Sequence, residues 1–379
     1  MFGFADRIRQ IESSGKKVID LSLGQPEVPA PKHIARALQE AIESPTSSYS
    51  ASAGSPELRS LIAERYTSES GAPTEASEVI VTNGSKHALF ISLLSIVDNG
   101  DEVVAFEPYF PPYLEIVELV GGKLKTVPVD DSKTEIKPDL EALFSAISSK
   151  TKVLLVNYPN NPSGWTLDQK QIERLADLCS EKGIYLLSDE IYDKIVFDGR
   201  KHTPSWTFSK DSDYVIGLGS FSKTYSMVPY RLGFLVARPF VSKEILKSQR
   251  ATITMVSPYV QAAGIAALRG SQGFVNSRLK KYQERRDKCL AMLRKKRIPI
   301  SEPKGAFYLF IRLPDKTDGF EFATDLLENE SVAVLPGVTF GKRWQNYIRI
   351  SFATEDSTLY QGLEKIVDAY NRHDLSVPT

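Results

Sequence analysis

The chain has 379 residues, of which 42% are hydrophobic and 25% charged, and its 47 basic and 47 acidic side chains give no net charge. This composition is typical of a globular protein long enough for two domains and excludes a largely disordered chain. The balanced charge argues against a nucleic-acid or membrane-surface partner, because binding to either needs a basic excess.

The N-terminal part of the chain reads as helical. A short amphipathic stretch at residues 1–17 is followed by a second helical pattern at residues 31–44, PKHIARALQEAIES. We expect both to pack with the C-terminal part of the chain. The polar stretch at residues 47–59 has the composition of a loop and is expected to cross between two domains.

The middle of the chain alternates strand and helix signals. Helical patterns begin at residues 85, 113 and 166, and at the third of these Thr166 and Gln169 have the spacing of a capping box. Short runs rich in β-branched residues lie between them, at residues 78–82, 101–106, 123–129, 152–157, 184–190 and 214–220. This alternation predicts βαβ units around a mostly parallel sheet that is buried on both faces.

The next strand signal, residues 233–237, follows the run at 214–220 after a connection too short for a helical crossover. These two strands are therefore expected to pair antiparallel. Beyond them, a long charged helix at about residues 276–296 leads to strand runs at 305–313, 332–337 and 346–353, with further helices between and after them.

These elements predict an α/β protein with a three-layer α/β/α large domain and a smaller α+β domain. We place the large domain at residues 45–280. Residues 1–44 together with 281–379 are expected to form the small domain.

Cysteine and histidine usage excludes two further classes. The two cysteines lie far apart without a CxxC pair, and the four histidines show no ligand spacing, so neither a disulfide framework nor a metal centre is expected. The first residues lack the apolar core of a signal peptide, and the longest apolar run, residues 88–97, is too short to span a bilayer. A cytoplasmic location with no membrane partner is predicted.

Chemistry-bearing residues follow the predicted strands one after another. In open α/β sheets ligands gather at the carboxyl ends of the strands. There the chain has an Asn-Gly-Ser-Lys turn opening a helix at 83–86, Tyr109 and Phe110, an Asn/Pro loop at 158–164, the pair Asp189 and Glu190, and the stretch from Ser220 to Arg231.

Each of these features alone is typical of a turn, a core aromatic or a solvated loop. Together they would satisfy one ligand. A helix N-terminus, serines and Arg231 suit a phosphate, Phe110 suits a flat ring, Asp189 suits a protonated ring nitrogen, and Lys223 can act as a Schiff-base nucleophile. That ligand is pyridoxal phosphate.

The sequence resembles the class I/II aminotransferases, which are fold-type-I pyridoxal-phosphate enzymes, and is most similar to the aspartate aminotransferase group. The resemblance extends from LSLGQPE at residues 21–27 to YIRISFA at 347–353. Its most specific parts are NYPNNPSG, SDEIY, and SFSK followed by RLG, in this order.

The resemblance implies roles for individual residues around the cofactor ring. Lys223 matches the lysine that binds the cofactor covalently and shuttles the proton. Asp189 matches the aspartate that pairs with the pyridine nitrogen, and Tyr192 and Asn161 match the partners of the phenolic oxygen. Phe110 takes the place of the aromatic side chain stacked on the ring.

It also implies the binding of the phosphate, the substrate and a second subunit. Arg349, with Gly24 and Asn161 nearby, matches the arginine that holds the substrate α-carboxylate. Tyr49 resembles the tyrosine that reaches the neighbouring subunit's phosphate, so a homodimer with shared active sites is implied. The residues that match the family's phosphate cradle are Gly84, Ser85, Lys86, Ser220, Ser222 and Arg231.

One segment departs from the family pattern. The common SMTGWRLG is here SMVPYRLG, with Val228, Pro229 and Tyr230 before Arg231. Proline removes a backbone donor and fixes φ. We expect cofactor binding to survive, because Arg231 is kept.

The resemblance implies transfer of the α-amino group of an L-amino acid, with aspartate as first choice, to a 2-oxoacid such as 2-oxoglutarate. No second arginine for a distal carboxylate is evident, so aromatic, alanine and branched-chain donors stay open. A carbon–sulfur or β/γ-eliminating lyase would use the same cofactor frame. A non-catalytic sensor with an appended DNA-binding domain is a weaker alternative, because the match begins near residue 20.

Overall fold

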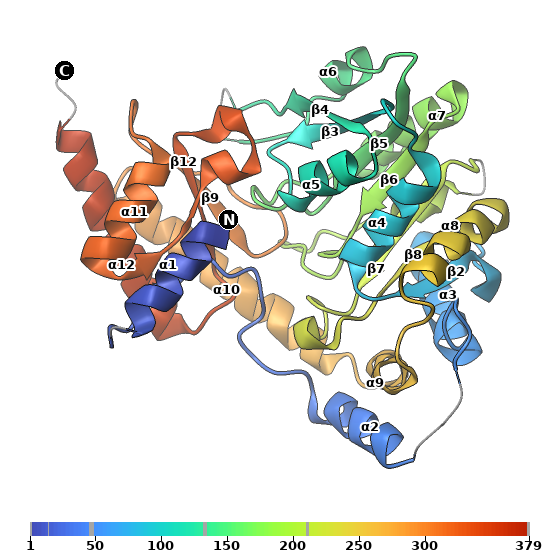
Figure 1. The fold of residues 1–379 in the computed structure, drawn as a ribbon. Helices are drawn as coiled ribbons and strands as arrows, with labels where there is room; N and C mark the ends of the chain where they lie inside the picture. Colours follow the sequence, from blue (N-terminus) through green and yellow to red (C-terminus); the bar gives the residue numbers. More distant parts are fainter. Residues whose placement is uncertain (1, 14, 45–48, 132–134, 210–211, 377–379) are drawn as a thin grey trace.

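The fold comes from a computed structural model, which describes residues 2–13, 15–44, 49–131, 135–209 and 212–376 (Figure 1). Its larger body is built on a seven-stranded sheet in the order β2-β8-β7-β6-β5-β3-β4. The strands are β2 (Val79–Thr82), β3 (Glu102–Glu107), β4 (Lys123–Pro128), β5 (Thr151–Asn157), β6 (Tyr185–Asp189), β7 (Val215–Ser220) and β8 (Gly233–Val236).

Strand direction in this sheet confirms the predicted pattern. Strands β3 to β7 pair parallel with one another, whereas β8 pairs antiparallel with both β7 and β2. Because β2 and β7 both oppose β8, β2 runs in the same direction as the parallel strands. The carboxyl ends of six strands therefore lie along one edge of the sheet.

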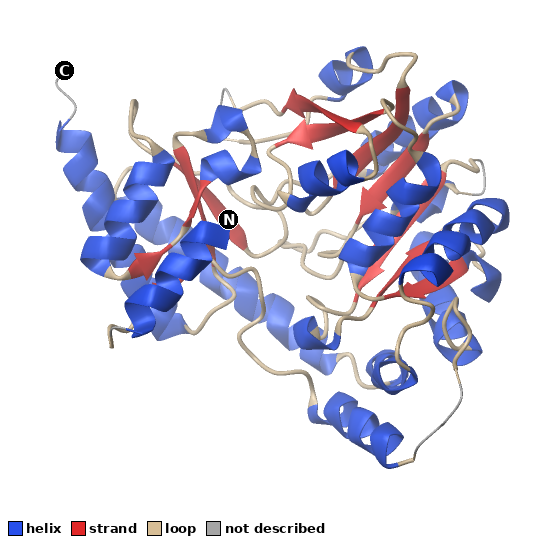
Figure 2. Cartoon of the chain, viewed as in Figure 1, coloured by secondary structure: helices blue, strands red, loops and turns tan. Residues whose placement is uncertain are grey.

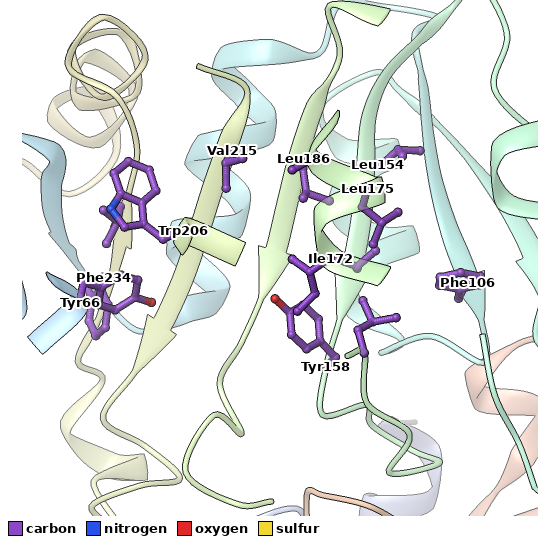
Figure 3. Close-up of a cluster of buried hydrophobic side chains, with 14 of the residues drawn as sticks. Tyr66, Phe106, Leu154, Tyr158, Ile172, Leu175, Leu186, Trp206, Val215 and Phe234 are labelled. Atoms are coloured by element: carbon purple, nitrogen blue, oxygen red, sulfur yellow. The ribbon is translucent and has the colours of Figure 1, made fainter. Parts of the chain in front are cut away.

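Helices cover both faces of the sheet, as Figure 2 shows. Strand residues alternate between the two faces, so that Leu186 packs into one hydrophobic cluster and Leu187 into the other. One face packs against α4 (Ser85–Ile96), α5 (Pro112–Leu119) and α8 (Pro239–Thr252). The other packs against α3 (Pro56–Ser70), α6 (Leu140–Ser145), α7 (Gln169–Lys182) and α9 (Pro258–Arg269), and part of this cluster is drawn in Figure 3.

One close approach in the sheet depends on a glycine. Gly219 of β7 lies opposite Phe234 of β8 in the antiparallel register. A Cβ atom at Gly219 would collide with the Phe234 ring, which also packs edge-on against Tyr66 and Phe221. The absence of a side chain at Gly219 thus lets the aromatic ring lie on the strand backbone.

The smaller body contains a three-stranded antiparallel sheet in the order β11-β12-β9 and a parallel pair of β1 with β10. These strands are β1 (Ile19–Asp20), β9 (Tyr308–Arg312), β10 (Val332–Ala333), β11 (Leu335–Pro336) and β12 (Tyr347–Ser351). Strands β1, β9, β10 and β12 share a second core with α10 (Gly273–Lys295), α11 (Gly319–Glu330) and α12 (Asp356–Ser376), whereas Leu335 of β11 packs into the cluster of the larger body. The N-terminal α1 (Phe2–Ser13) packs through Ile8 against Leu327 and Ala333.

Helix α2 (Lys32–Glu43) does not pack with the smaller body as expected. It lies against α9, and its Ile34 is fully buried in the core of the larger body. The expectation is therefore wrong for α2, although α1 and β1 do pack with the C-terminal part. The apolar face of a helix requires a partner but does not specify which one. The predicted boundary at residue 44 adjoins residues 45–48, which lie outside the described residues, and the boundary at 280 stays a prediction.

The start of α7 also differs from the prediction. The capping box is formed by Asp168 and Gln171, each accepting a 2.9 Å hydrogen bond from the backbone N–H of the other. Thr166 and Gln169, two residues earlier, have the same spacing and similar polar chemistry. Sequence spacing alone does not distinguish the two registers.

Truncation of a core residue tests this packing. Leu186 lies in the central strand β6 with no exposed surface, so Leu186→Ala should lower the free energy of unfolding by about 2–5 kcal/mol through the cavity it leaves. Leu119→Ala is the matched control, because Leu119 is 73% exposed, and it should change stability by no more than about 0.5 kcal/mol. Denaturant unfolding measures both, and equal losses would contradict the described packing.

Candidate active site

A cavity of about 1060 Å³ lies where the carboxyl edge of the large sheet meets the smaller body. The sequence placed fourteen residues at a candidate site, and twelve of them line this cavity. They are Gly24, Ser85, Lys86, Phe110, Asn161, Asp189, Tyr192, Ser220, Ser222, Lys223, Arg231 and Arg349. The other two, Gly84 and Tyr49, do not.

Asp189 is a buried carboxylate with one unsatisfied oxygen. It is the last residue of β6 and is 5% exposed. Its Oδ2 accepts a 2.6 Å hydrogen bond from the Tyr113 hydroxyl, whereas Oδ1 is buried with no partner among the described residues. Burial raises the pKa of Asp189 to about 6, although the Tyr113 hydrogen bond acts in the opposite direction. A cationic N–H donor in the cavity would satisfy Oδ1 and keep the carboxylate charged.

Lys223 follows β7 by three residues and also faces the cavity. Its Nζ donates a 2.5 Å hydrogen bond to the backbone carbonyl of Gly24. Burial, followed by the nearby Arg349 and Arg231 guanidinium groups, lowers the pKa of Lys223 to about 8. A lysine in this setting is neutral more often than a surface lysine, as a nucleophile or a base requires.

The start of α4 and the turn after β7 bring together groups that suit an anion. Gly84, with φ of +80°, precedes Ser85 at the helix N-terminus, where backbone N–H groups have no intrahelical partner. A Cβ atom at Gly84 would collide with the Arg231 guanidinium, so this glycine brings backbone and guanidinium together. Ser220 accepts a 3.1 Å hydrogen bond from the Ser222 backbone and leaves its hydroxyl hydrogen for a ligand.

The departure from the family pattern is accommodated locally. Val228, Pro229 and Tyr230 form a single 3₁₀ turn, and Arg231 follows it with φ of +55°. The Arg231 guanidinium donates a 3.2 Å hydrogen bond to the Val228 carbonyl. The proline sits where the turn needs no backbone donor from it, so Arg231 still reaches the cavity.

Arg349 enters the cavity from β12 of the smaller body. Although β12 alternates like a surface strand, Arg349 is only 4% exposed, which excludes a solvent-facing position. Its guanidinium donates a 3.0 Å hydrogen bond to the Asn161 side chain and another to the Ser22 carbonyl. Its Nε is buried without a partner in the described part of the chain, so hydrogen-bonding capacity remains for a carboxylate.

Three further residues support the site and were missed by the sequence analysis. Tyr308 of β9 shares a 2.7 Å hydrogen bond with the Tyr192 hydroxyl, and its ring lies 4.3 Å from the Arg349 guanidinium carbon. Asn157 donates to the Asp189 carbonyl at 2.9 Å and accepts from the Asn161 backbone at 2.8 Å. The third is Tyr113, whose hydroxyl donates a hydrogen bond to Asp189. The aromatic cluster after β3 was the one available signal for Tyr113, whereas Tyr308 and Asn157 lie within strands and read as core.

Two predicted residues have a different setting. Phe110 lies at the cavity wall beneath the Lys86 ammonium, whose nitrogen is 5.8 Å from the ring centroid. Tyr49 is 83% exposed and lies outside the cavity lining. Its predicted contact with a second subunit stays a prediction.

The described ranges contain neither a metal-binding cluster nor a membrane-spanning helix. No group of histidine, cysteine, aspartate or glutamate there could hold a metal ion. Across the same ranges, every helix is too short or too polar to cross a bilayer.

Comparisons with known proteins give a consistent result. Residues 16–366 match the sequence profile of the family described as aminotransferase class I and II. The chain is 36% identical over 375 residues to the aspartate aminotransferase of Pyrococcus horikoshii, covering 97% of this chain and 93% of the relative. It is 32% identical over 355 residues to an aromatic-amino-acid aminotransferase of Thermococcus litoralis, covering 93% and 90%. The crystal structure of an aspartate aminotransferase from Thermotoga maritima is similar with a TM-score of 0.91 at 30% identity, covering 98% and 96%.

The buried carboxylate predicts a pH-dependent stability of the ligand-free protein. Because the pKa of Asp189 is raised to about 6, its contribution favours the folded state at low pH and is lost as pH rises from about 4 to 6. Asp189→Asn should therefore stabilise the ligand-free protein by about 2–3 kcal/mol at pH 7 and by little at pH 4. Denaturant unfolding at both pH values measures this, and a variant equally stable to the parent at pH 7 would contradict it.

Proposed function

Because the chain belongs to the class I and II aminotransferases, we propose that it transfers the α-amino group of L-aspartate to a 2-oxoacid, using pyridoxal phosphate held in the described cavity. The observation that carries this proposal is the pairing of two groups in one cavity. Lys223 is an amine with a lowered pKa, and Asp189 is a buried carboxylate with one oxygen that has no partner in the part of the chain that the structure describes. A bare phosphate-binding site would need neither.

The residues present fit this cofactor. The unpartnered Oδ1 of Asp189 suits the protonated ring nitrogen, and Phe110 offers an aromatic face at the cavity wall. Arg231 and the N-terminus of α4, brought together by Gly84, suit the phosphate, with Ser220 and Ser222 beside them. When bound, pyridoxal phosphate supplies an electron-withdrawing ring that stabilises the charge left by removal of the substrate α-proton.

Lys223 would hold and move the proton. A pKa of about 8 gives a larger neutral fraction near neutral pH than a surface lysine has, so its Nζ could accept a proton from the substrate α-carbon and deliver it to the carbon on the far side of the amino nitrogen. The Gly24 carbonyl, 2.5 Å from Nζ, gives the protonated amine a hydrogen-bond acceptor.

Arg349 would orient the substrate. Its free Nε and the guanidinium edge held by Asn161 suit a substrate α-carboxylate, and a fixed carboxylate limits the direction in which the α-hydrogen points. Tyr308 and Asn161 hold the guanidinium, and Tyr192 lies beside them through its hydrogen bond with Tyr308. By fixing the orientation of the substrate, these contacts support selective cleavage of the bond between the α-carbon and its hydrogen.

Aspartate as donor is supported by further cations at the cavity wall. With Arg349 assigned to the α-carboxylate, Arg231 to phosphate and Lys223 to the proton, the cavity lining still contains Lys86 and Arg9, and either cation suits the distal carboxylate of aspartate. The relatives named aspartate aminotransferase support the same donor.

An aromatic donor is the second candidate. Leu23, which lines the cavity next to Gly24, is 50% exposed and offers apolar surface to a substrate side chain. The relative named as an aromatic-amino-acid aminotransferase supports the same reading.

We also propose that two copies form a homodimer in which Tyr49 of each reaches the phosphate site of the other. The high exposure of Tyr49 supports this arrangement. A cytoplasmic location is supported by two buried cysteines that form no disulfide.

The half-reaction with aspartate tests the proposal. Purified protein loaded with pyridoxal phosphate should show a visible absorption band that disappears on adding L-aspartate alone and returns on adding 2-oxoglutarate. A band unmoved by aspartate but removed by phenylalanine or tyrosine would favour the aromatic donor instead. Release of ammonia without a 2-oxoacid would favour the lyase alternative, and the absence of any band would overturn the site.

Lys223→Ala should abolish turnover, because no other described residue combines a neutral amine with this position. We expect a loss of at least about 10³-fold in kcat. Lys247→Ala, at an exposed lysine paired with Glu244, is the control and should keep full activity. Steady-state transamination retained by Lys223→Ala, measured by 2-oxoacid formation, would falsify the assignment.

A further inference from the structure

The segment between β1 and α2, residues 21–31, connects the two bodies of the protein, and we call it the strap. Its first end continues β1, which pairs with β10 of the smaller body. Its other end enters α2, which packs on α9 of the larger body. Figure 1 shows it as the blue chain that runs past α10 between α1 and α2.

Backbone carbonyls of the strap contact both cations of the proposed chemistry. The Ser22 carbonyl accepts a hydrogen bond from the Arg349 guanidinium, and the Gly24 carbonyl accepts one from Lys223 Nζ at 2.5 Å. The position of the strap therefore affects the group that would bind the substrate carboxylate and the group that would move the proton.

Three residues beyond Gly24, the side chain of Glu27 is fixed by an ion cluster that is largely shielded from solvent around Arg285. It is 11% exposed, and its Oε1 accepts hydrogen bonds from Arg285, at 2.6 Å, and from Arg278, both on α10. Arg285, 4% exposed at its side chain, also donates to Asp356 at the start of α12, at 2.8 Å.

The Glu27 carboxylate keeps its charge in this setting. Burial acts to raise the pKa of Glu27, but the hydrogen bonds from Arg278 and Arg285 outweigh it and lower the pKa. Removing one member of such a cluster leaves the other charges without a partner in a poorly solvated place. The attachment of the strap to α10 therefore depends on the charge of the Glu27 carboxylate.

We propose that Glu27 is a positioning residue for the reaction: by fixing the strap to α10, it holds the Ser22 and Gly24 carbonyls against Arg349 and Lys223. This inference rests on the proposed function for its kinetic consequence, but not for its structural one. Strand β1 has only two residues, so the backbone ladder ends before Gly24. A displacement of about 1 Å of a positioning group is enough to cost up to about 10²-fold in rate or affinity.

The alternative is that the ion cluster only stabilises the fold. Lys281 of α10 distinguishes the two, because its Nζ donates a 2.7 Å hydrogen bond to Asp356 of α12 and is not among the groups bonded to Glu27. Lys281→Met weakens the same cluster while leaving the bonds of Glu27 to Arg278 and Arg285 in place. It is the matched control for Glu27→Gln.

The experiment compares the parent protein with Glu27→Gln, Glu27→Asp and Lys281→Met. Affinity for succinate, a dicarboxylate that cannot react, is read from the change in the visible band of the cofactor-loaded protein. Hydrogen exchange of the strap amides is measured on the cofactor-free protein, and thermal unfolding monitors stability.

For Glu27→Gln we expect the Kd of succinate and the KM of the amino donor to rise about tenfold through Arg349, and kcat to fall about tenfold through Lys223. Exchange of the strap amides should be faster than in the parent protein. Glu27→Asp should be intermediate, and Lys281→Met should match the parent in succinate affinity and strap exchange even if its thermal stability falls.

The proposal is overturned if Glu27→Gln keeps the parent's succinate affinity and strap exchange. It is also overturned if Lys281→Met loses as much succinate affinity as Glu27→Gln. Should Glu27→Gln not fold, Arg278→Lys, which keeps the charge but loses the guanidinium geometry, is subjected to the same comparison. If the parent protein transaminates no amino acid, the proposed function fails, whereas hydrogen exchange still decides whether Glu27 holds the strap.

Discussion

The burial of one negative charge at the end of a central strand is the constraint on which the site depends. Asp189 ends β6 in the interior of the sheet, and its neighbour Glu190 points to the opposite side, where His202 and Ser205 bind it at 2.8 and 2.6 Å. Glu190 is satisfied by the protein, whereas Asp189 keeps an oxygen that no residue of the described chain contacts with a hydrogen bond. A buried carboxylate of this kind lowers stability unless something positively charged completes it. The fold thus tolerates a local instability that a bound cation would relieve.

The site also draws on both bodies of the molecule. Asp189 and Lys223 come from the edge of the large sheet, whereas Arg349 and Tyr308 come from the small one, and the strap contacts cations of both. No single supersecondary unit contains the proposed chemistry. Its geometry depends on contacts between the bodies, among them the hydrogen bond between Tyr192 and Tyr308.

The sequence predicted the sheet and the cavity residues at the strand ends because both follow from local rules, whereas Gly24 and Arg349 were implied only by the family resemblance. β-branched runs separated by helical patterns require parallel strands, and parallel strands bring their carboxyl ends to one edge. Contacts set by tertiary packing were not predictable in this way. Tyr308 reads as a core aromatic of a strand, and nothing in its neighbourhood indicates that its hydroxyl meets Tyr192. The position of α2 was wrong for the same reason, since Ile34 needs burial but does not specify α9.

The pairing of Gly219 with Phe234 restricts the order in which residues at these two positions of the sheet can be substituted. The two residues are opposite in the register of β7 and β8, and the ring occupies the volume that any side chain at position 219 would need. A substitution at 219 is tolerable only after the ring at 234 has become smaller, whereas a reduction at 234 leaves a void that a larger residue at 219 can then fill. The two positions should therefore behave as an ordered pair over evolutionary time. Lys223 lies four residues beyond Gly219, in the turn that follows β7. A substitution at position 219 before one at position 234 would therefore disturb the strand that leads into this turn.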